Sequence, residues 1–344
     1  MTKRLRWLAL GVVVTAVAVA CSSREDSIVV MTHDSFAVSE EVLASFTDET
    51  GITVEILRAG DGGTMVNQAI LTKDNPLADV LFGVDNTLLS RAVDAGIFTA
   101  YRPPGADLLD AGLLVPGDPV TPVDVGDVCL NYDRAAFAAP GLPVPESLSD
   151  LTDPAYRGML VVEDPATSTP GLAFLLATIT VFGEDTAYDW HDYWTDLRAN
   201  DIAVTAGWEE AYYGQFSGGA GEGTRPLVVS YASSPPAEVL FGELSEAPTG
   251  VITDGCFRQI EYVGILAGSD AGAAAQQLID FFIGIAFQED IPLTMFVFPV
   301  RPDAALPALF AEHTTVPDHP AVMDPGRIDR NRQRWIAEWT EIMR

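Results

Sequence analysis

The chain has 344 residues, with 19 Lys and Arg against 49 Asp and Glu, which gives a formal net charge of −30. So few basic residues exclude a general nucleic-acid-binding protein, because they cannot neutralise a run of phosphates. The hydrophobic fraction of 48% argues against disorder, since such a chain can bury a core. The length suggests about two domains.

The amino terminus has the pattern of an export signal. Three basic residues precede an uncharged, mostly apolar run over residues 7–20. This run is shorter than the about 20 residues that span a bilayer, so a signal peptide over residues 1–20 is expected. The small residues 18–20 before Cys21 resemble a bacterial lipobox, and they also fit an ordinary secretory cleavage site. With Cys21 lipidated, residues 21–26 form a tether on the outer face of the cell membrane; otherwise the protein is periplasmic.

Two further cysteines, Cys129 and Cys256, lie far apart in the sequence. In an oxidising compartment they are candidates for one disulfide, and the alternative is two separate buried thiols. A bond between them would close a loop of more than a hundred residues. Such a loop closure stabilises a fold by about 4–5 kcal/mol.

The first part of the chain alternates strands and helices. Strands are predicted at residues 27–31, 52–57 and 78–82, and helices at 40–50, 64–71 and 86–95. This order indicates a parallel sheet covered by helices, with the turns after the strands along one edge. Ligands bind at that edge in open α/β sheets. Asp34 belongs to the first of these turns, and Asp61 and Gly62 belong to the second.

A second domain follows a loop and an extended segment at 122–132. Its predicted elements are strands at 159–163 and 227–231 and helices at 171–181, 187–197 and 209–216. A strand at 261–267 then returns to the first domain, before helices at 271–285 and 327–344. We therefore expect two lobes joined by a hinge: lobe I from residues 27–125 and 258–344, and lobe II from residues 126–257.

The sequence carries no recognisable catalytic signature. Its four histidines have no metal-ligand spacing, and it lacks the G-x-S-x-G motif of serine hydrolases. A secreted enzyme is therefore the weakest functional hypothesis. The adjacent Tyr212 and Tyr213 suggest ferric-iron ligands, or simply one buried and one exposed ring on a helix.

Six segments, in order along nearly the whole mature chain, resemble periplasmic thiamine-binding proteins. They are residues 32–36 (THDSF), 79–86 (DVLFGVDN), 164–171 (DPATSTPG), 207–212 (GWEEAY), 230–235 (SYASSP) and 334–339 (RWIAEW). The resemblance implies an α/β periplasmic-binding-protein fold of type II, with two parallel-rich sheets joined by a hinge. It also implies a monomer that captures thiamine, or its mono- or diphosphate, and delivers it to the permease of an ABC importer. No reaction and no cofactor are expected.

Thiamine combines a cationic thiazolium, an aminopyrimidine and a hydroxyethyl arm, so its site needs aromatic faces, a carboxylate and hydroxyl or amide donors. The resemblance places Asp61 and Gly62 at a ligand-contacting turn, with the Asp61 carboxylate facing the cation or the amino group. Other roles remain open, because Asp61 also fits a turn, Ser168 a helix cap and Trp208 a core position. The other expected ligand-binding residues are Asp34, Ser168, Thr169, Trp208, Tyr231, Ala232, Ser233, Ser234 and Phe296.

The sequence departs from the family in its aromatic residues. Phe296 and Phe298 occupy positions where the family has Trp and Tyr, and residues 235–238 lack an aromatic that relatives have. A phenylalanine still stacks on a ring, but with a weaker face and no polar tip. These departures leave open the preference between thiamine and its phosphates. Ferric iron, through Tyr212 and Tyr213, and a polyamine, through an acidic cleft, are the alternative ligands on the same fold.

Overall fold

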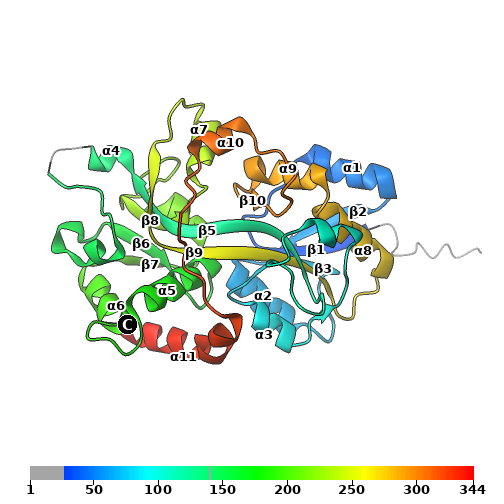
Figure 1. Ribbon diagram of the computed structural model, residues 1–344, viewed down its shortest axis with the longest axis horizontal. Coiled ribbons are helices and arrows are strands. Elements are labelled where there is room, and N and C mark those ends of the chain that lie inside the picture. The colour runs from blue at the N-terminus through cyan, green and yellow to red at the C-terminus, as the bar shows by residue number, and fades with distance from the viewer. Residues whose placement is uncertain (1–26, 139–140) are drawn as a thin grey trace, which may run out of the picture.

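The computed structural model describes residues 27–138 and 141–344 (Figure 1). The predicted signal peptide, Cys21 and the tether lie outside these residues. Within the described part of the chain, no helix is both long and apolar enough to cross a membrane.

The first half of the molecule is the predicted parallel unit. Strand β1 (Ser27–Thr32) pairs in parallel with β2 (Thr53–Arg58) and with β3 (Val80–Asp85), which is buried along its whole length. Helices complete the crossovers: α1 (Glu40–Thr50), α2 (Gly62–Leu71) and α3 (Leu89–Asp94). The turns after β1 and β2 therefore lie together at one edge of the sheet, as expected from right-handed crossovers.

The second half repeats this design with shorter strands. Strand β6 (Leu160–Glu163) pairs in parallel with β7 (Ala203–Thr205) and β8 (Leu227–Tyr231). Helix α5 (Thr169–Phe182) is buried over most of its length, and α6 (Trp190–Ala199) packs beside it. The helix expected at 209–216 is a short π-helix, Glu210–Gln215.

Two long antiparallel strands join the halves. Strand β5 (Thr121–Asp133) pairs with β9 (Thr249–Leu266), and both cross the middle of the molecule (Figure 1). The expectation of two separate sheets is corrected, because ten strands form one mixed sheet. Eight of them follow the order β2-β1-β3-β9-β5-β8-β6-β7. The short strands β4 (Phe98–Thr99) and β10 (Phe298–Pro299) pair with β9 and β5. The sheet is continuous because neither long strand ends at the boundary between the halves.

The carboxyl-terminal part holds further helices. Instead of one helix at 271–285 there are two, α8 (Gly272–Phe282) and α9 (Ile285–Thr294). Three short helices had not been predicted: α4 (Arg134–Phe137), α7 (Pro235–Gly242) and α10 (Ala308–His313).

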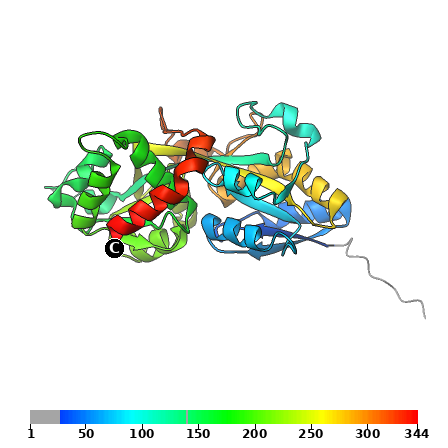
Figure 2. The same cartoon turned by 90° about the horizontal axis from the view of Figure 1, so that it is seen from below.

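The last helix, α11 (Pro325–Met343), differs from the expected lobe assignment. The sequence placed it in lobe I, but it packs against α6 of the second half and also reaches α3 (Figure 2). Its buried Trp339 meets Trp194 edge to face, with ring centroids 5.5 Å apart. The chain thus returns to the second half at its end.

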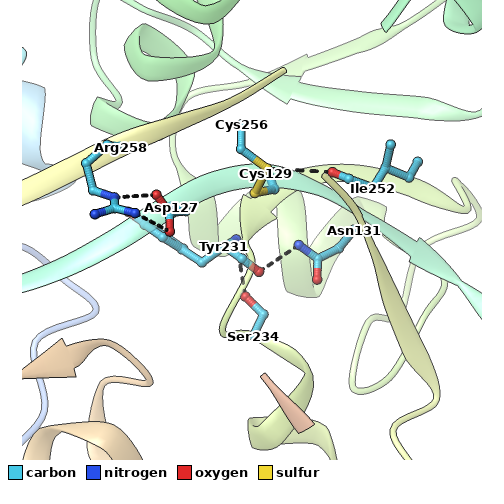
Figure 3. The surroundings of a disulfide bond; sticks show 8 residues. All are labelled: Asp127, Cys129, Asn131, Tyr231, Ser234, Ile252, Cys256 and Arg258. Atoms are coloured by element: carbon cyan, nitrogen blue, oxygen red, sulfur yellow. Dashed lines mark hydrogen bonds and ion pairs between the residues drawn. A yellow bond between two sulfur atoms is a disulfide. The ribbon is translucent and has the colours of Figure 1, made fainter. Parts of the chain in front are cut away.

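A disulfide ties β5 to β9. Cys129 and Cys256 are bonded, with Cα atoms 4.4 Å apart, and both are buried (Figure 3). They lie where the pairing of the two strands changes register, between Val128 and Leu130. The covalent bond therefore fixes the two connecting strands at an irregular point of their ladder.

We predict that a Cys129→Ser/Cys256→Ser double variant loses about 5 kcal/mol of unfolding free energy, because the bond closes a loop of 127 residues. Denaturant unfolding with and without a reducing agent measures this loss. The reducing agent should destabilise the wild-type protein and leave the variant unchanged. Equal stability of the two proteins under oxidising conditions would contradict the prediction.

Candidate functional site

The two halves enclose a cavity of about 720 Å³. Its walls come from the turns after β1 and β2 on one side and from the start of α5, the π-helix and the end of β8 on the other. Its floor is the stretch where β5 and β9 cross between the halves. The cavity thus lies at the sheet edge that the sequence indicated for ligand binding.

Most of the predicted ligand-binding residues line this cavity. Ser168 instead caps α5, where its Oγ accepts a hydrogen bond from Gly171 N, and it is buried. Ala232 packs against the disulfide, and Ser233 is buried away from the cavity wall. The predicted residues on the wall are Asp34, Asp61, Gly62, Thr169, Trp208, Tyr231, Ser234 and Phe296.

The carboxylate of Asp61 connects the two halves. Asp61 is the N-cap of α2, yet its side chain makes no hydrogen bond to its own helix. It instead accepts hydrogen bonds from Thr169 N at 3.0 Å, Trp208 N at 3.1 Å and Ser168 Oγ at 3.2 Å. Thr169 is the first residue of α5, so an acid of one half caps a helix of the other, where a negative charge is favoured.

Two glycines let the halves come this close. A Cβ on Gly62 would lie 2.8 Å from Thr169 Cγ2, and one on Gly63 would lie 2.6 Å from the carbonyl oxygen of Thr167. That same oxygen accepts a hydrogen bond of 3.1 Å from Thr64 N. The start of α2 therefore docks directly on the start of α5, and the cleft is closed at this point.

Trp208 holds a planar face beside the cavity. Its indole Nε1 donates to Ser230 Oγ at 2.9 Å, which in turn lies 2.9 Å from Ser234 Oγ. The indole also stacks on Tyr212, with ring centroids 5.0 Å apart. Hydrogen bonds and stacking together fix the orientation of the half-buried ring.

The aromatic rim of the cavity includes Phe241, which the sequence analysis missed, beside the predicted Phe296. Phe296 has a left-handed backbone, with φ of 57°, and its ring lies 5.6 Å from that of Phe241. Phe241 belongs to α7, which begins at Pro235 and Pro236. Prolines favour the first turn of a helix, and this signal predicts α7 and the position of Phe241 on it.

Asp34 ties two turns and also faces the cavity. Its Oδ1 accepts a hydrogen bond from Gly60 N at 3.1 Å, so it joins the turn after β1 to the turn after β2. Asp34 also lines the cavity, so its predicted contact with a ligand stays a prediction.

The tyrosine pair is poorly arranged for iron. The hydroxyl of Tyr212 donates to Glu238 Oε1 at 2.8 Å, and burial and this carboxylate raise its pKa well above the usual value. An iron-binding tyrosine must lose that proton. Among the described residues, no group of three or more His, Cys, Asp or Glu is placed to hold a metal ion.

Residues 75–317 match a family described as bacterial extracellular solute-binding proteins. The chain belongs to this family. The thiamine-binding periplasmic protein of Escherichia coli K12 is 32% identical over 318 residues, which are 90% of this chain and 91% of that protein. The protein of the same name from Brucella suis biovar 1 is 30% identical over 327 residues, 92% of this chain and 91% of that protein.

Solved structures agree with this assignment. A periplasmic thiamin binding protein superposes with a TM-score of 0.81 at 30% identity, covering 92% of this chain and 96% of that one. Iron-bound HitA from Pseudomonas aeruginosa superposes at 0.73 with 20% identity, covering 92% and 99%, which shows the shared fold alone. The predicted periplasmic-binding-protein fold and the resemblance to thiamine-binding proteins are confirmed, and the family confirms a solute-binding protein, not an enzyme.

The cavity of this solute-binding protein is electrostatically acidic. Burial is the main reason why the pKa of Asp61 is raised, against the hydrogen bonds that it accepts from Trp208 and Thr169. Burial by itself would lower the pKa of His33, but the neighbouring carboxylates of Glu261, Asp61 and Asp34 outweigh it and raise that pKa. A cationic or hydrogen-bond-donating solute would relieve this accumulation of acids.

We predict that Asp61→Ala loosens the contact between the halves of the ligand-free protein. Amide hydrogen exchange at Thr169 and Trp208, followed by NMR, should accelerate at least about tenfold, because a hydrogen bond to a charged acceptor contributes about 1.5–3 kcal/mol. Asp324→Ala is the matched control, since Asp324 caps its own helix α11 through Arg327 N. That variant should leave exchange at Thr169 and Trp208 unchanged, and unchanged exchange in Asp61→Ala as well would refute the role of Asp61.

Proposed function

We propose that this protein captures thiamine outside the cytoplasmic membrane and delivers it to the permease of an ABC importer. The observation that carries the proposal is a cavity in which aromatic faces and carboxylates surround the same space. This combination suits a ligand with one cationic ring and one neutral ring, because cation–π contact adds up to about 2 kcal/mol when water is excluded. The thiamine-binding relatives, at 30–32% identity over most of the chain, support the same ligand.

We infer that capture works by closure of two lobes about β5 and β9. The division near residues 126 and 258 is retained, with α11 moving together with the second lobe because it packs on α6. Asp61 then stabilises the closed state by capping α5 from the opposite lobe. A ligand that contacts both walls shifts the population towards closure, which is the state that a permease can recognise.

Free thiamine fits this cavity better than its phosphates do. No Lys or Arg is present among the described residues that line it, and the start of α5, otherwise suited to a phosphate, is already capped by Asp61. A diphosphate would instead face several carboxylates. The six acidic residues on the wall are Asp34, Asp61, Asp124, Glu209, Glu210 and Glu261.

The acidic wall also supports a second candidate, a polyamine. Several carboxylates around one cavity suit a linear chain of ammonium groups, which needs no aromatic faces. Ferric iron is less compatible, because the Tyr212 hydroxyl donates a hydrogen bond to Glu238 and its raised pKa opposes loss of the proton.

The proposal includes an anchored, monomeric protein. The sequence before the described residues supports export and lipidation at Cys21, and the family is extracellular. A short tether over residues 21–26 would hold the binding protein near its permease without constraining closure.

A thermal-shift series with thiamine, thiamine diphosphate, spermidine and ferric citrate separates the candidate ligands. Thiamine is expected to raise the melting temperature most, because at equal concentration a tighter ligand stabilises the folded state more. Its dissociation constant should be at least about tenfold lower than that of the diphosphate. A shift with spermidine alone would favour the polyamine, and no shift with any thiamine form would refute the proposed function.

Trp208→Ala is expected to weaken thiamine binding at least tenfold in calorimetry, because it removes the fixed aromatic face and opens the stack on Tyr212. Trp208→Phe is the matched control, since it keeps an aromatic ring but loses the hydrogen bond to Ser230 and part of the flat face. It should bind with an intermediate affinity. Unchanged affinity in a folded Trp208→Ala variant would remove this residue from the site.

A further inference from the structure

The floor of the cavity is made by four facing positions of β5 and β9. Asp124 lies opposite Glu261, and Gly126 lies opposite Gln259. Because successive side chains of a strand alternate between faces, these four positions share one face of the sheet, and all of them line the cavity. Gly126 leaves room for the ring of Tyr231, whose Cδ1 lies 3.1 Å from where a Cβ would be.

Two acceptors of this floor are buried and lack a donor. Asp124 is 1% exposed, and its Oδ2 has no hydrogen-bond partner. Gln259 is also 1% exposed; its Nε2 donates to Glu261 Oε1 at 3.3 Å, which leaves its own Oε1 unpartnered. A buried acceptor without a donor destabilises a fold, so the floor gains stability when N–H groups reach it.

The surrounding charges point to the same kind of ligand. His33 Nε2 lies 3.4 Å from Glu261 Oε2, and His33 is the single basic group among the described residues of the cavity wall. Asp85 of β3 is the cross-strand neighbour of Glu261 on the other side of β9 and is buried, and Asp61 lies on the cavity wall. Burial first, and then the charge of Glu261 and a hydrogen bond to it, raise the pKa of Asp124 well above its usual value, and a ligand that brings N–H donors relieves this crowding of acids.

We propose that this floor binds the aminopyrimidine ring of the ligand through its amino group, with Asp124 and Gln259 as the acceptors. The inference rests on the proposed function, because it assigns one end of thiamine to one surface. The thiazolium ring has no N–H donor and its hydroxyethyl arm brings a single O–H, so this end of the ligand cannot satisfy both unpartnered acceptors. The aminopyrimidine can, and the thiazolium then lies against the aromatic wall.

The test compares thiamine with oxythiamine, in which an oxygen replaces the amino group of the pyrimidine. Calorimetry on the wild-type protein should show at least about tenfold weaker binding of oxythiamine, because its exocyclic oxygen would face two acceptors and has no hydrogen to donate. In Asp124→Asn the amide can turn its NH₂ group towards that oxygen. The preference for thiamine should therefore fall at least about fivefold, and Glu261→Gln serves as a second variant if the first does not fold.

Asp85→Asn is the matched control. It neutralises a buried acid that faces Glu261 but does not line the cavity, so the ratio of the two affinities should stay at the wild-type value. Equal affinities for thiamine and oxythiamine in the wild-type protein would overturn the inference and leave the proposed function intact, as would a preference that persists in Asp124→Asn. Absence of thiamine binding to the wild-type protein would instead overturn the proposed function itself.

Discussion

One carboxylate holds the two halves of this molecule together at the cleft. Asp61 begins α2, but its oxygens accept hydrogen bonds from the other half, at Thr169, Ser168 and Trp208. The approach depends on Gly62 and Gly63, because a side chain on either would clash with the start of α5. The shape of the cavity, the position of Trp208 and the closure of the cleft all follow from this contact.

The strands that join the halves have a second role. In β5 and β9, the residues that cross the boundary also present Asp124, Gln259 and Glu261 to the cavity. A bend of these strands during opening would therefore change the spacing of the acceptors. In the proposed mechanism the same few residues serve both recognition and movement. The disulfide a few positions further along covalently ties the two strands.

The sequence predicted the parallel unit of the first half well, because β-branched runs and glycine-ended helices are local signals. It failed where structure depends on distant partners. The early part of β9 was missed because it contains exposed residues and a glycine that do not alternate as a strand should. Helix α7 was not predicted although two prolines begin it, so Phe241 was missed.

The candidate site was predicted only in part, because its contacts also depend on residues that are distant in the sequence. Asp61 was selected because its turn resembles a ligand-contacting turn of the family, but its partners lie more than a hundred residues away, and no local pattern shows that it caps α5. Asp124 was not marked at all, because an acid in an extended segment looks like a solvated residue until the opposite strand is known. Sequence patterns identify which residues lie in turns, whereas their contacts require the pairing of the two halves.

The cap that Asp61 places on α5 affects how readily the cleft closes without a solute. Its hydrogen bonds join protein to protein, so the closed form carries stability of its own before any solute arrives. A binding protein with such a contact needs less free energy from its ligand to close, which raises apparent affinity. The same contact also populates an empty closed form, and a permease that reads closure alone would meet unloaded carriers. Such a permease would then have to recognise a part of the surface that changes only when solute is bound. The stronger the Asp61 contact is, the more the permease depends on that difference to tell loaded from unloaded protein.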